Sequence, residues 1–422
     1  METVVEEMAM NANRVSVIVP LWNGAAFIGD CLKHLAAQTI AEQIEILVVD
    51  DASTDEGAAL VETSFPHVRL LRRPVNGGFA AACNTGLQAA SGDVLVLLNQ
   101  DVLLAPDAIE RLVAALNVPE RGVVGGKLRY PDGRLQHAGG YLLWPQAFGM
   151  HDGVGEPDEG QYDTPREVEF LTGALLAVRR NVFERVGGLD EGFYPAYYED
   201  VDWCFRIRAA GYRVWYAPDV VGTHQEGSAL RRASHREIAY HRGRWRFLLK
   251  HMPPARLLAE TMPAEMADAQ LWQNQHTPYA LQQAWLAAMV QAATLLRRQW
   301  QADEQTVFDV VRALQLLANQ AWQAEQSFRF MLPQEPPRLA LPRPEWSPSR
   351  WKRLRQRLRW WIYTHLWRYE HEQLISQQNA INAELQQAVK WMQVELASVR
   401  QALSWLAHDI AYSAQGEEES HE

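Results

Sequence analysis

The N-terminal part of the chain alternates short apolar runs with segments of helical pattern. The apolar runs cover 15–20, 45–51, 68–72 and 94–99, and the helical segments that follow them cover 25–37, 54–63, 78–90 and 106–116. Runs that are apolar almost throughout are typical of parallel strands buried on both faces. The alternation therefore predicts an α/β fold with a mostly parallel central sheet covered by helices.

The same domain is expected to continue to about residue 250. Its later elements are, in order, a turn at 130–133, a surface loop over 149–166, an apolar segment over 170–178, a helix over 199–210 and a strand over 212–217. Gly, Pro and acidic residues predict the loop, and Tyr130-Pro131-Asp132-Gly133 is a turn signal between strand-like segments.

The C-terminal part is predicted to be helical, because glycine nearly vanishes after about residue 245. Helices are expected over 281–299 and 305–330. The basic, tryptophan-rich segment 350–361 matches an interfacial helix on anionic lipid, or equally a helix packed against acidic protein. Apolar steps of three and four over 374–406 predict an amphipathic helix or coiled coil that could drive self-association. The predicted regions are an α/β domain 1–250, a helical domain 251–332, a proline-rich linker 333–349 and a C-terminal segment 350–422.

Composition excludes several classes of protein. The net charge of −11 argues against a nucleic-acid binder. The acidic residues 1–13 do not resemble a signal peptide, and no window is apolar enough for a membrane span. Cys31, Cys83 and Cys204 lack CxxC spacing and are expected to be reduced, buried thiols. We therefore expect a cytoplasmic protein, with peripheral contact at the inner face of the membrane through 350–361.

Polar residues follow three of the predicted strands. Asn23 follows the first strand, Asp50 and Asp51 close the second, and 99–101 (Asn-Gln-Asp) close the fourth. Ligands of open α/β sheets bind outside the carboxyl ends of the strands. A single such residue is commonly a helix cap, but three in register favour one shared binding site. Gly77-Gly78 opens a helix and is a weak signal for anion binding.

Ordered blocks of sequence give a specific resemblance. They are Val17-Ile18-Val19-Pro20, Asn23, Ile46-Leu47-Val48-Val49-Asp50-Asp51-Ala52-Ser53-Thr54-Asp55, Asn76-Gly77-Gly78-Phe79-Ala80, Asn84, Gly86, Leu97-Leu98-Asn99-Gln100-Asp101, Phe170-Leu171-Thr172-Gly173-Ala174, Gly188-Leu189-Asp190-Glu191-Gly192-Phe193, Tyr198-Glu199-Asp200-Val201-Asp202-Trp203-Cys204 and His224. In this order the blocks resemble the inverting glycosyltransferase family 2 over about 15–227. Within the family they most resemble the branch that includes rhamnosyltransferases of surface-polysaccharide assembly.

The resemblance implies a GT-A fold that binds a nucleotide-sugar donor. Asp50 or Asp51 would hold the base and ribose, because carboxylates accept hydrogen bonds from ribose hydroxyls and ring N–H groups. The donor-binding residues implied are Pro20, Asn23, Asp50, Asp51, Gly78, Asn84, Asn99 and Asp101. Branch resemblance alone points to dTDP-rhamnose as donor, and to a glycan or lipid-linked acceptor.

The resemblance also implies a divalent metal ion, Mg²⁺ or Mn²⁺. Asp101 matches the last residue of the family's metal motif, and its ion would also bind the donor diphosphate. The first position of that motif is Asn99, a weaker ligand than the usual aspartate, although the rhamnosyltransferase branch often has asparagine there. His224 matches a metal-binding histidine of some members, and it could equally be structural.

Asp200 matches the family's catalytic base, beside Glu199. A buried aspartate with a carboxylate neighbour can have a raised pKa, which suits a general base. The alternative is an acidic helix N-terminus stabilised by the helix dipole. By resemblance, Thr172, Gly173 and Trp203 would line the acceptor pocket, although packing in the core is an equal alternative for Trp203.

Two other functions remain open on the sequence. The first is a sugar-1-phosphate nucleotidyltransferase, but the loop 21–25 lacks the basic residues which that chemistry needs. The second is a non-catalytic scaffold that acts through its helical tail. The presence of both Asp101 and Asp200 argues against it.

Overall fold

The computed structural model describes residues 14–226, 233–271 and 278–329. The strands are β1 (Val15–Leu21), β2 (Ile44–Asp50), β3 (Arg69–Arg72), β4 (Val94–Leu98), β5 (Val102–Leu104), β6 (Arg121–Arg129), β7 (Leu135–His137), β8 (Gly140–Leu143), β9 (Phe148–His151), β10 (Arg166–Glu167), β11 (Leu175–Arg179) and β12 (Arg213–His224). The helices are α2 (Ile28–Ala36), α3 (Gly57–Ser64), α4 (Gly78–Ala89), α5 (Ala108–Leu116), α6 (Arg180–Val186), α7 (Glu199–Ala209), α8 (Ala233–His251), α9 (Pro254–Arg256), α10 (Met262–Leu271), α11 (Pro278–Trp300) and α12 (Glu304–Arg329). Short helical turns are η1 (Ala41–Gln43), η2 (Glu191–Phe193) and η3 (Leu257–Thr261).

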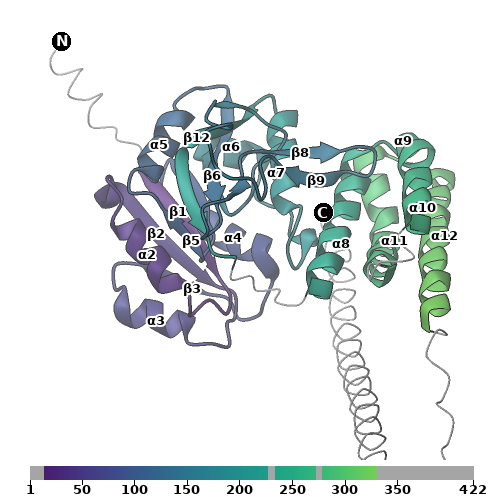
Figure 1. Cartoon of the computed structure of the whole chain (residues 1–422), viewed down its shortest axis with the longest axis horizontal. Helices are drawn as coiled ribbons and strands as arrows, with labels where there is room; N and C mark the ends of the chain where they lie inside the picture. The colour runs from purple at the N-terminus through teal and green to yellow at the C-terminus, as the bar shows by residue number, and fades with distance from the viewer. Residues whose placement is uncertain (1–13, 227–232, 272–277, 330–422) are drawn as a thin grey trace, which may run out of the picture. The chain divides into compact units, whose positions relative to one another are not determined.

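The central sheet confirms the predicted fold class. Across the described residues its order is β10-β12-β6-β11-β4-β1-β2-β3, with β5 beside β12 and β7 beside β6 (Figure 1). Strands β1 to β4 run parallel, whereas β11 is antiparallel to both β4 and β6. The carboxyl ends of β1, β2 and β4 therefore lie at one edge of the sheet, as the sequence predicts.

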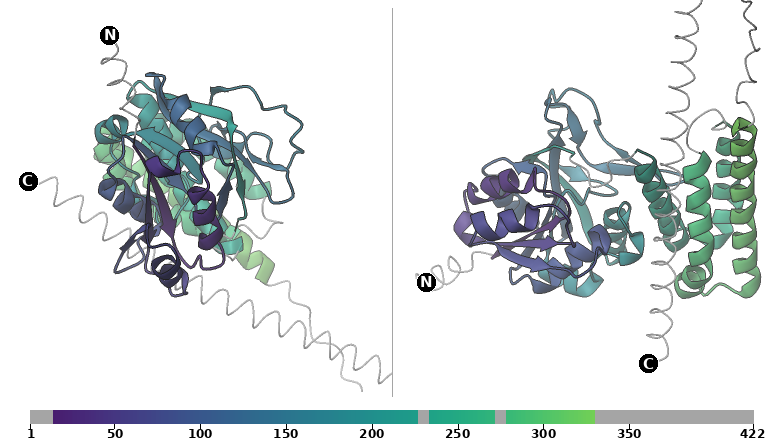
Figure 2. Two further views of the ribbon diagram at one scale, coloured as in Figure 1. Left: turned by 90° about the vertical axis from the view of Figure 1, so that its left-hand side faces the viewer. Right: turned by 90° about the horizontal axis from the view of Figure 1, so that it is seen from below.

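The sheet is covered by helices on both faces, which is why its strands are apolar throughout (Figure 2). Successive side chains of a strand point to opposite faces. Val17 and Val19 of β1 pack into a core with α2, α3 and α5. Ile18, between them, packs into a second core with α4 and α7. All three side chains are fully buried.

A second, two-stranded sheet corrects one sequence prediction. Residues 148–151 form β9, which pairs antiparallel with β8. The surface loop predicted over 149–166 is therefore wrong at its first residues, where a glycine-containing segment is held by cross-strand bonds that its composition does not reveal. The rest of the loop is held by Lys127, which is 2% exposed and pairs with Asp158 and Asp163.

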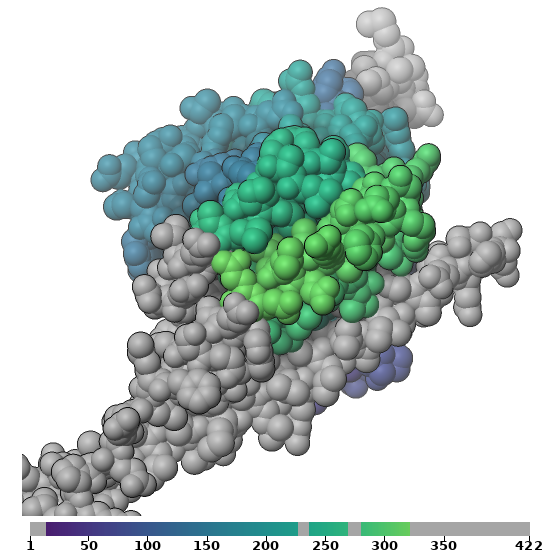
Figure 3. Space-filling view, turned by 90° about the vertical axis from the view of Figure 1, so that its right-hand side faces the viewer, coloured from purple at the N-terminus to yellow at the C-terminus, as the bar shows by residue number. Residues whose placement is uncertain are grey.

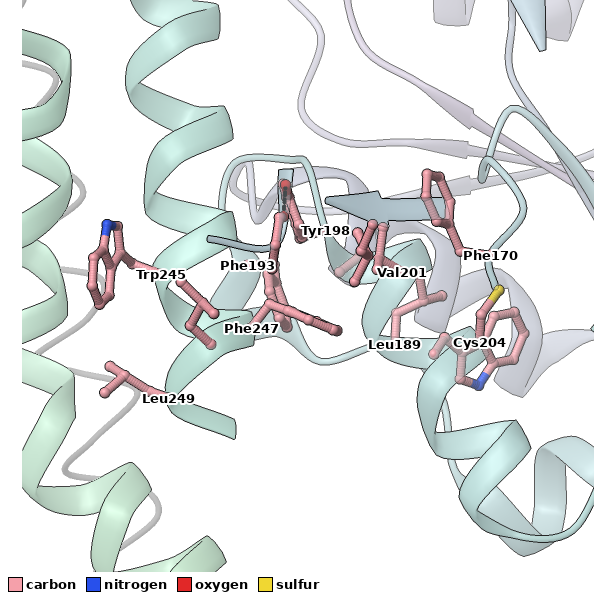
Figure 4. Close-up of a cluster of buried hydrophobic side chains, with 14 of the residues drawn as sticks. Phe170, Leu189, Phe193, Tyr198, Val201, Cys204, Trp245, Phe247 and Leu249 are labelled. Carbon is pink, nitrogen blue, oxygen red and sulfur yellow. Dashed lines mark hydrogen bonds between the residues drawn. The ribbon is translucent and has the colours of Figure 1, made fainter. Parts of the chain in front are cut away.

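The helices beyond residue 250 contact α8 and also the segment between β8 and β9, where the Thr261 hydroxyl donates to the Pro145 carbonyl at 2.9 Å. Tyr198 and Phe247 lie between α7 and α8, while Trp245 and Leu249 lie on the opposite side of α8 (Figure 4). Side chains of the later helices lie directly against one another (Figure 3). Helix α8 crosses the predicted domain boundary at residue 250, and the division into domains stays a prediction.

Several predictions concern parts of the chain outside the described residues. These are the proline-rich linker 333–349, the basic segment 350–361 and the helix 374–406. Within the described ranges, no helix is both long and apolar enough to cross a membrane. The three cysteines are buried and free.

Candidate active site

Side chains and backbone groups connect the strand ends at the carboxyl edge of the sheet. The side chain of Gln100 accepts from the Trp22 N–H (3.1 Å) and donates to the Trp22 carbonyl (3.2 Å), which joins the end of β4 to the end of β1. Asn23 Oδ1 accepts from the Thr54 N–H at 2.8 Å, which joins β1 to β2. Gln100 is thus a structural residue, although the sequence motif places it between two candidate ligands.

The two adjacent aspartates at the end of β2 differ in their contacts. Asp51 accepts from the N–H groups of Gly77 (3.0 Å) and Gly78 (2.8 Å) and from Arg73 Nε (2.8 Å). Burial raises the pKa of Asp51, against the lowering effect of these donors. The Asp50 carboxylate accepts from the Ser53 N–H at 3.0 Å. Asp51 therefore closes the turn before α4, and the Gly78 N–H is already engaged within the protein.

Two further predicted donor residues are also engaged by the protein itself. The Asn84 amide donates to the Leu189 carbonyl (2.8 Å) and accepts from the Leu189 N–H (2.9 Å). It thereby ties α4 to the loop that precedes η2. Pro20 lies within β1, opposite Val49 of β2. These contacts give both residues a role in shaping the edge of the sheet.

A polar chain leads from Asp101 towards solvent. Asp101 Oδ1 lies 3.1 Å from His224 Nε2, and His224 Nδ1 lies 2.7 Å from Gln136 Oε1. Gln136 Nε2 donates to Glu226 Oε1 at 2.9 Å. Asp101 and Gln136 are buried, and Glu226 is exposed. The backbone adds a link, because the Gln225 N–H donates to the Asp101 carbonyl at 2.9 Å.

The row of polar contacts from Asp101 to Glu226 fits a divalent cation at its inner end. A carboxylate only accepts hydrogen bonds, so the Gln136 amide must turn its nitrogen to Glu226 and its oxygen to His224. His224 Nδ1 therefore carries a proton, and in the neutral ring the lone pair of Nε2 faces the Asp101 carboxylate. Two electron-pair donors that face one another are the arrangement which a bound metal ion stabilises, with its histidine held by an outer hydrogen bond.

The neighbouring Asn99 adds to this fit, because its buried Oδ1 makes no hydrogen bond within the described structure. Among the described residues, no group of three or more His, Cys, Asp or Glu side chains forms a complete metal cage. A small set of protein ligands is typical of ions that share their coordination with substrate phosphates.

Glu199 and Asp200 are two adjacent carboxyl groups at the start of α7. Asp200 Oδ2 accepts from the Gly173 N–H and Oδ1 from the Val201 N–H, both at 2.8 Å. Burial raises the pKa of Asp200. Burial and then the charge of Asp200 raise the pKa of Glu199 well above its usual value, and Glu199 Oε2 is buried without a hydrogen-bond partner. The two N–H groups that donate to Asp200, and the lack of a partner at Glu199 Oε2, favour Asp200 as the charged member of the pair.

The predicted acceptor residues divide into two groups. Gly173 contacts Asp200 directly, and the neighbouring Thr172 accepts from the Ala174 N–H at 3.3 Å. Trp203, in contrast, is fully buried, and its indole N–H donates to the Gly187 carbonyl at 2.9 Å. The prediction that Trp203 faces the acceptor is therefore wrong, because it lies on the core side of α7.

The candidate carboxylates lie close enough to two buried thiols to raise the pKa of each. Burial has the largest effect on the pKa of Cys83, and three carboxylates raise it further, those of Glu199, Asp51 and Asp200. Burial and then Asp101 raise the pKa of Cys31. The end of β2 and the start of α7, about 150 residues apart in sequence, thus act on one side chain of α4.

Several non-glycine residues around this edge have left-handed backbone conformations. They are Asn23 (φ 48°), Ala52 (57°), Tyr197 (82°), Tyr198 (73°) and Glu226 (48°). Such conformations cost about 1–3 kcal/mol each and cluster at functional sites. They follow β1 and β2, precede α7 and follow β12, which are the segments that carry the candidate ligands and base.

Comparison with known proteins identifies the family of this chain. Residues 16–187 match the glycosyl transferase family 2 model, and 164–322 match that of glycosyl transferase family 21. The N-acetylglucosaminyl-diphospho-decaprenol L-rhamnosyltransferase of Mycobacterium tuberculosis is 30% identical in an alignment of 243 positions that covers 51% of this chain and 78% of that protein. The chain belongs to glycosyltransferase family 2. This membership confirms the family and the GT-A type of fold expected from the sequence.

Other relatives of this family 2 protein are matched over a smaller part of their length. The O-antigen biosynthesis protein RfbC of Myxococcus xanthus is 35% identical over 52% of this chain and 18% of its own length. The uncharacterised protein y4gI of Sinorhizobium fredii is 31% identical over 55% of this chain and 27% of its own length. The chain thus spans about a quarter or less of these two proteins.

Solved structures give weaker likenesses to this family 2 protein. The match to S. aureus TarS covers 75% of this chain and 55% of the TarS chain, with 16% identity and a TM-score of 0.46. The match to the mannosyltransferase PcManGT of Pyrobaculum calidifontis covers 75% of this chain and 86% of the PcManGT chain, with 22% identity and a TM-score of 0.43.

Sequence reasoning missed three residues of this site. Gln136 lies in the short strand β7, and Glu226 follows β12, 90 residues later. Arg73 follows β3 and reaches Asp51. None of the three belongs to a local motif, and only the pairing of β7 and β12 with β6 brings the first two together.

Proposed function

We propose that this chain transfers a sugar from a nucleoside-diphosphate donor to an acceptor hydroxyl, with inversion at the sugar carbon. One observation carries the proposal. The Asn99 N–H donates to the Ala174 carbonyl at 3.0 Å, and the adjacent Gly173 N–H donates to Asp200 at 2.8 Å. The segment that ends in Asp101 is therefore tied, through two consecutive residues, to the candidate base.

Asp200 acts as the general base in this proposal. Its carboxylate takes the proton of the acceptor hydroxyl as that oxygen bonds to the sugar carbon. The bond from this carbon to the diphosphate oxygen breaks, and the nucleoside diphosphate leaves with the electron pair. A raised pKa strengthens Asp200 as a base, and a protonated Glu199 leaves it as the charged member of the pair.

The donor is bound at the carboxyl edge of β1, β2 and β4. Asp50 is available to the base and ribose, since Asp51 is engaged by the turn before α4. Asp101 and His224 would hold Mg²⁺ or Mn²⁺, and Asn99 offers a free amide oxygen nearby. When bound, the ion neutralises negative charge on the diphosphate.

The rhamnosyltransferase of M. tuberculosis makes dTDP-rhamnose the first donor to test, with a lipid-linked glycan as the first class of acceptor. Support for this finer assignment is the match over 78% of that protein. The transfer chemistry proposed above is common to all donor sugars.

The proposal is tested by a thermal-shift screen of dTDP-, UDP- and GDP-sugars, with and without Mn²⁺. A ligand that binds only the folded state raises the melting temperature. Asp200→Asn should retain donor binding and lose about 10²- to 10⁴-fold in transfer rate. Glu184→Gln, an exposed change on α6, is the matched control and should leave both unchanged. Transfer by Asp200→Asn at the native rate would remove the assigned base, and no response to any donor would leave only a scaffold role.

A further inference from the structure

We propose that Gln136 and Glu226 are positioning residues that hold His224 in the one tautomer able to offer Nε2 to a divalent cation. The inference rests on the proposed function, because it concerns the ion expected at Asp101. Neither residue belongs to the sequence blocks that define the family resemblance.

The direction of each hydrogen bond follows from the group at the outer end. Glu226 can only accept, so the Gln136 amide nitrogen donates to it. The Gln136 oxygen then accepts from His224 Nδ1–H. This order holds whether Nε2 carries a proton in the empty site or not, because Nδ1 is a donor in both forms. When a cation arrives, Nε2 is the nitrogen that binds it.

The surrounding fold makes this chain stiff. Gln136 is 8% exposed and lies in β7, which pairs with β6, and His224 is the last residue of β12, which also pairs with β6. Glu226 has a left-handed backbone (φ 48°), and the Gln225 N–H before it is bonded to the Asp101 carbonyl. Burial and then the charge of Glu226 raise the pKa of Tyr130, which places a second polar group beside the outer carboxylate.

Without the Glu226 carboxylate, the Gln136 amide is no longer fixed in one orientation. In Glu226→Gln the new side chain can accept or donate, so the Gln136 amide can reverse and present its N–H to His224. The ring then carries its proton on Nε2, which cannot bind a metal. In Gln136→Leu the ring loses its partner altogether. Outer partners of metal-binding histidines typically contribute about 10- to 100-fold in metal affinity.

A charge-conserving exchange separates this role from general stability. In the double variant Gln136→Glu/Glu226→Gln, the new carboxylate accepts from His224 Nδ1–H and the new amide donates to that carboxylate. The order of donors is restored although both residues are changed. Gln38 supplies the matched control, because it is a buried glutamine (5% exposed) whose amide donates to the carbonyls of His34 and Ala105.

The experiment measures Mn²⁺ binding by electron paramagnetic resonance, in the presence of a nucleoside diphosphate, on the full chain. We expect Glu226→Gln and Gln136→Leu to bind Mn²⁺ about 10-fold or more weakly, the exchange variant to return to within about threefold of the native protein, and Gln38→Leu to match it. Native affinity in Glu226→Gln, which alters only an exposed residue, would overturn the inference.

Nitrogen-15 NMR of the metal-free protein gives an independent readout. The native His224 ring should show its proton on Nδ1, and Glu226→Gln should shift the population towards Nε2–H, with the signal assigned by its loss in His224→Ala. An unchanged tautomer of His224 in Glu226→Gln contradicts the proposed role of Gln136 and Glu226. If the native protein binds no Mn²⁺, the metal site in the proposed function is wrong. The tautomer measurement still decides whether Gln136 and Glu226 hold the His224 ring.

Discussion

The buried pair Arg244–Glu265 allows a stability effect to be worked out from the structure. Arg244 Nη1 and Nη2 lie 2.6 Å and 3.0 Å from the two Glu265 oxygens, and Nη1 also donates to the Gln146 carbonyl at 2.8 Å. Their side chains are 0% and 3% exposed. Arg244 also lies over the Phe148 ring, 4.3 Å from its centroid. The pair thus ties α8 and α10 to the segment between β8 and β9.

Arg244→Met removes the cation but keeps much of the volume, and so leaves Glu265 buried without a countercharge. Loss of one partner of a buried ion pair costs about 3–5 kcal/mol. In a protein of this size, each kcal/mol of lost unfolding free energy lowers the melting temperature by about 2–4 °C. The expected total is on the order of 10 °C. Urea unfolding followed by tryptophan fluorescence measures the free energy, and calorimetry measures the melting temperature.

The double variant Arg244→Met/Glu265→Leu is the decisive comparison. Replacement of a buried pair by apolar groups of similar size is often nearly neutral, so the double variant should be more stable than either single variant. If Arg244→Met costs less than about 1 kcal/mol, or the two single losses simply add, the pair is not the buried, mutually dependent contact described above.

Three further predictions concern the base and the contact between α4 and the sheet. The folded pKa of Glu199 is raised, so its contribution to stability is complete at low pH and is lost as pH rises through that pKa; Glu199→Gln should flatten this dependence in urea unfolding measured from pH 4 to 8. Transfer should fall as pH drops through the raised pKa of Asp200, at a higher pH than for an ordinary aspartate, in a kcat–pH profile. A Cβ added at Gly86 would lie 2.3 Å from Ile18 Cγ2, so Gly86→Ala should cost about 1–3 kcal/mol of unfolding free energy.

The parts of the fold that were predictable are those with a local physical signature. Apolar runs identify strands buried on both faces, and β1 to β4 appear where the runs lie. The position of Asp50 and Asp101 at strand ends follows from the geometry of parallel sheets. Both inferences need only the pattern within a few residues.

The parts that were not predictable depend on pairing at long range. Gln136 reaches His224 across 88 residues, and no spacing in the sequence signals that contact. Trp203 was misplaced because the sequence does not say which face of α7 meets the core. Strand β9 was missed because it is held by β8, not by its own composition.

The left-handed backbone at Ala52, Tyr197 and Tyr198 has a consequence for laboratory evolution. Glycine adopts such angles without the steric penalty that other residues incur. A library selected only for heat resistance should therefore accumulate glycine at Ala52, where little side-chain packing is lost. Selection for turnover should resist this change, because the added backbone freedom would loosen the segment that follows Asp50 and Asp51. The two selection regimes should diverge first at the loops of this edge and leave the strands unchanged.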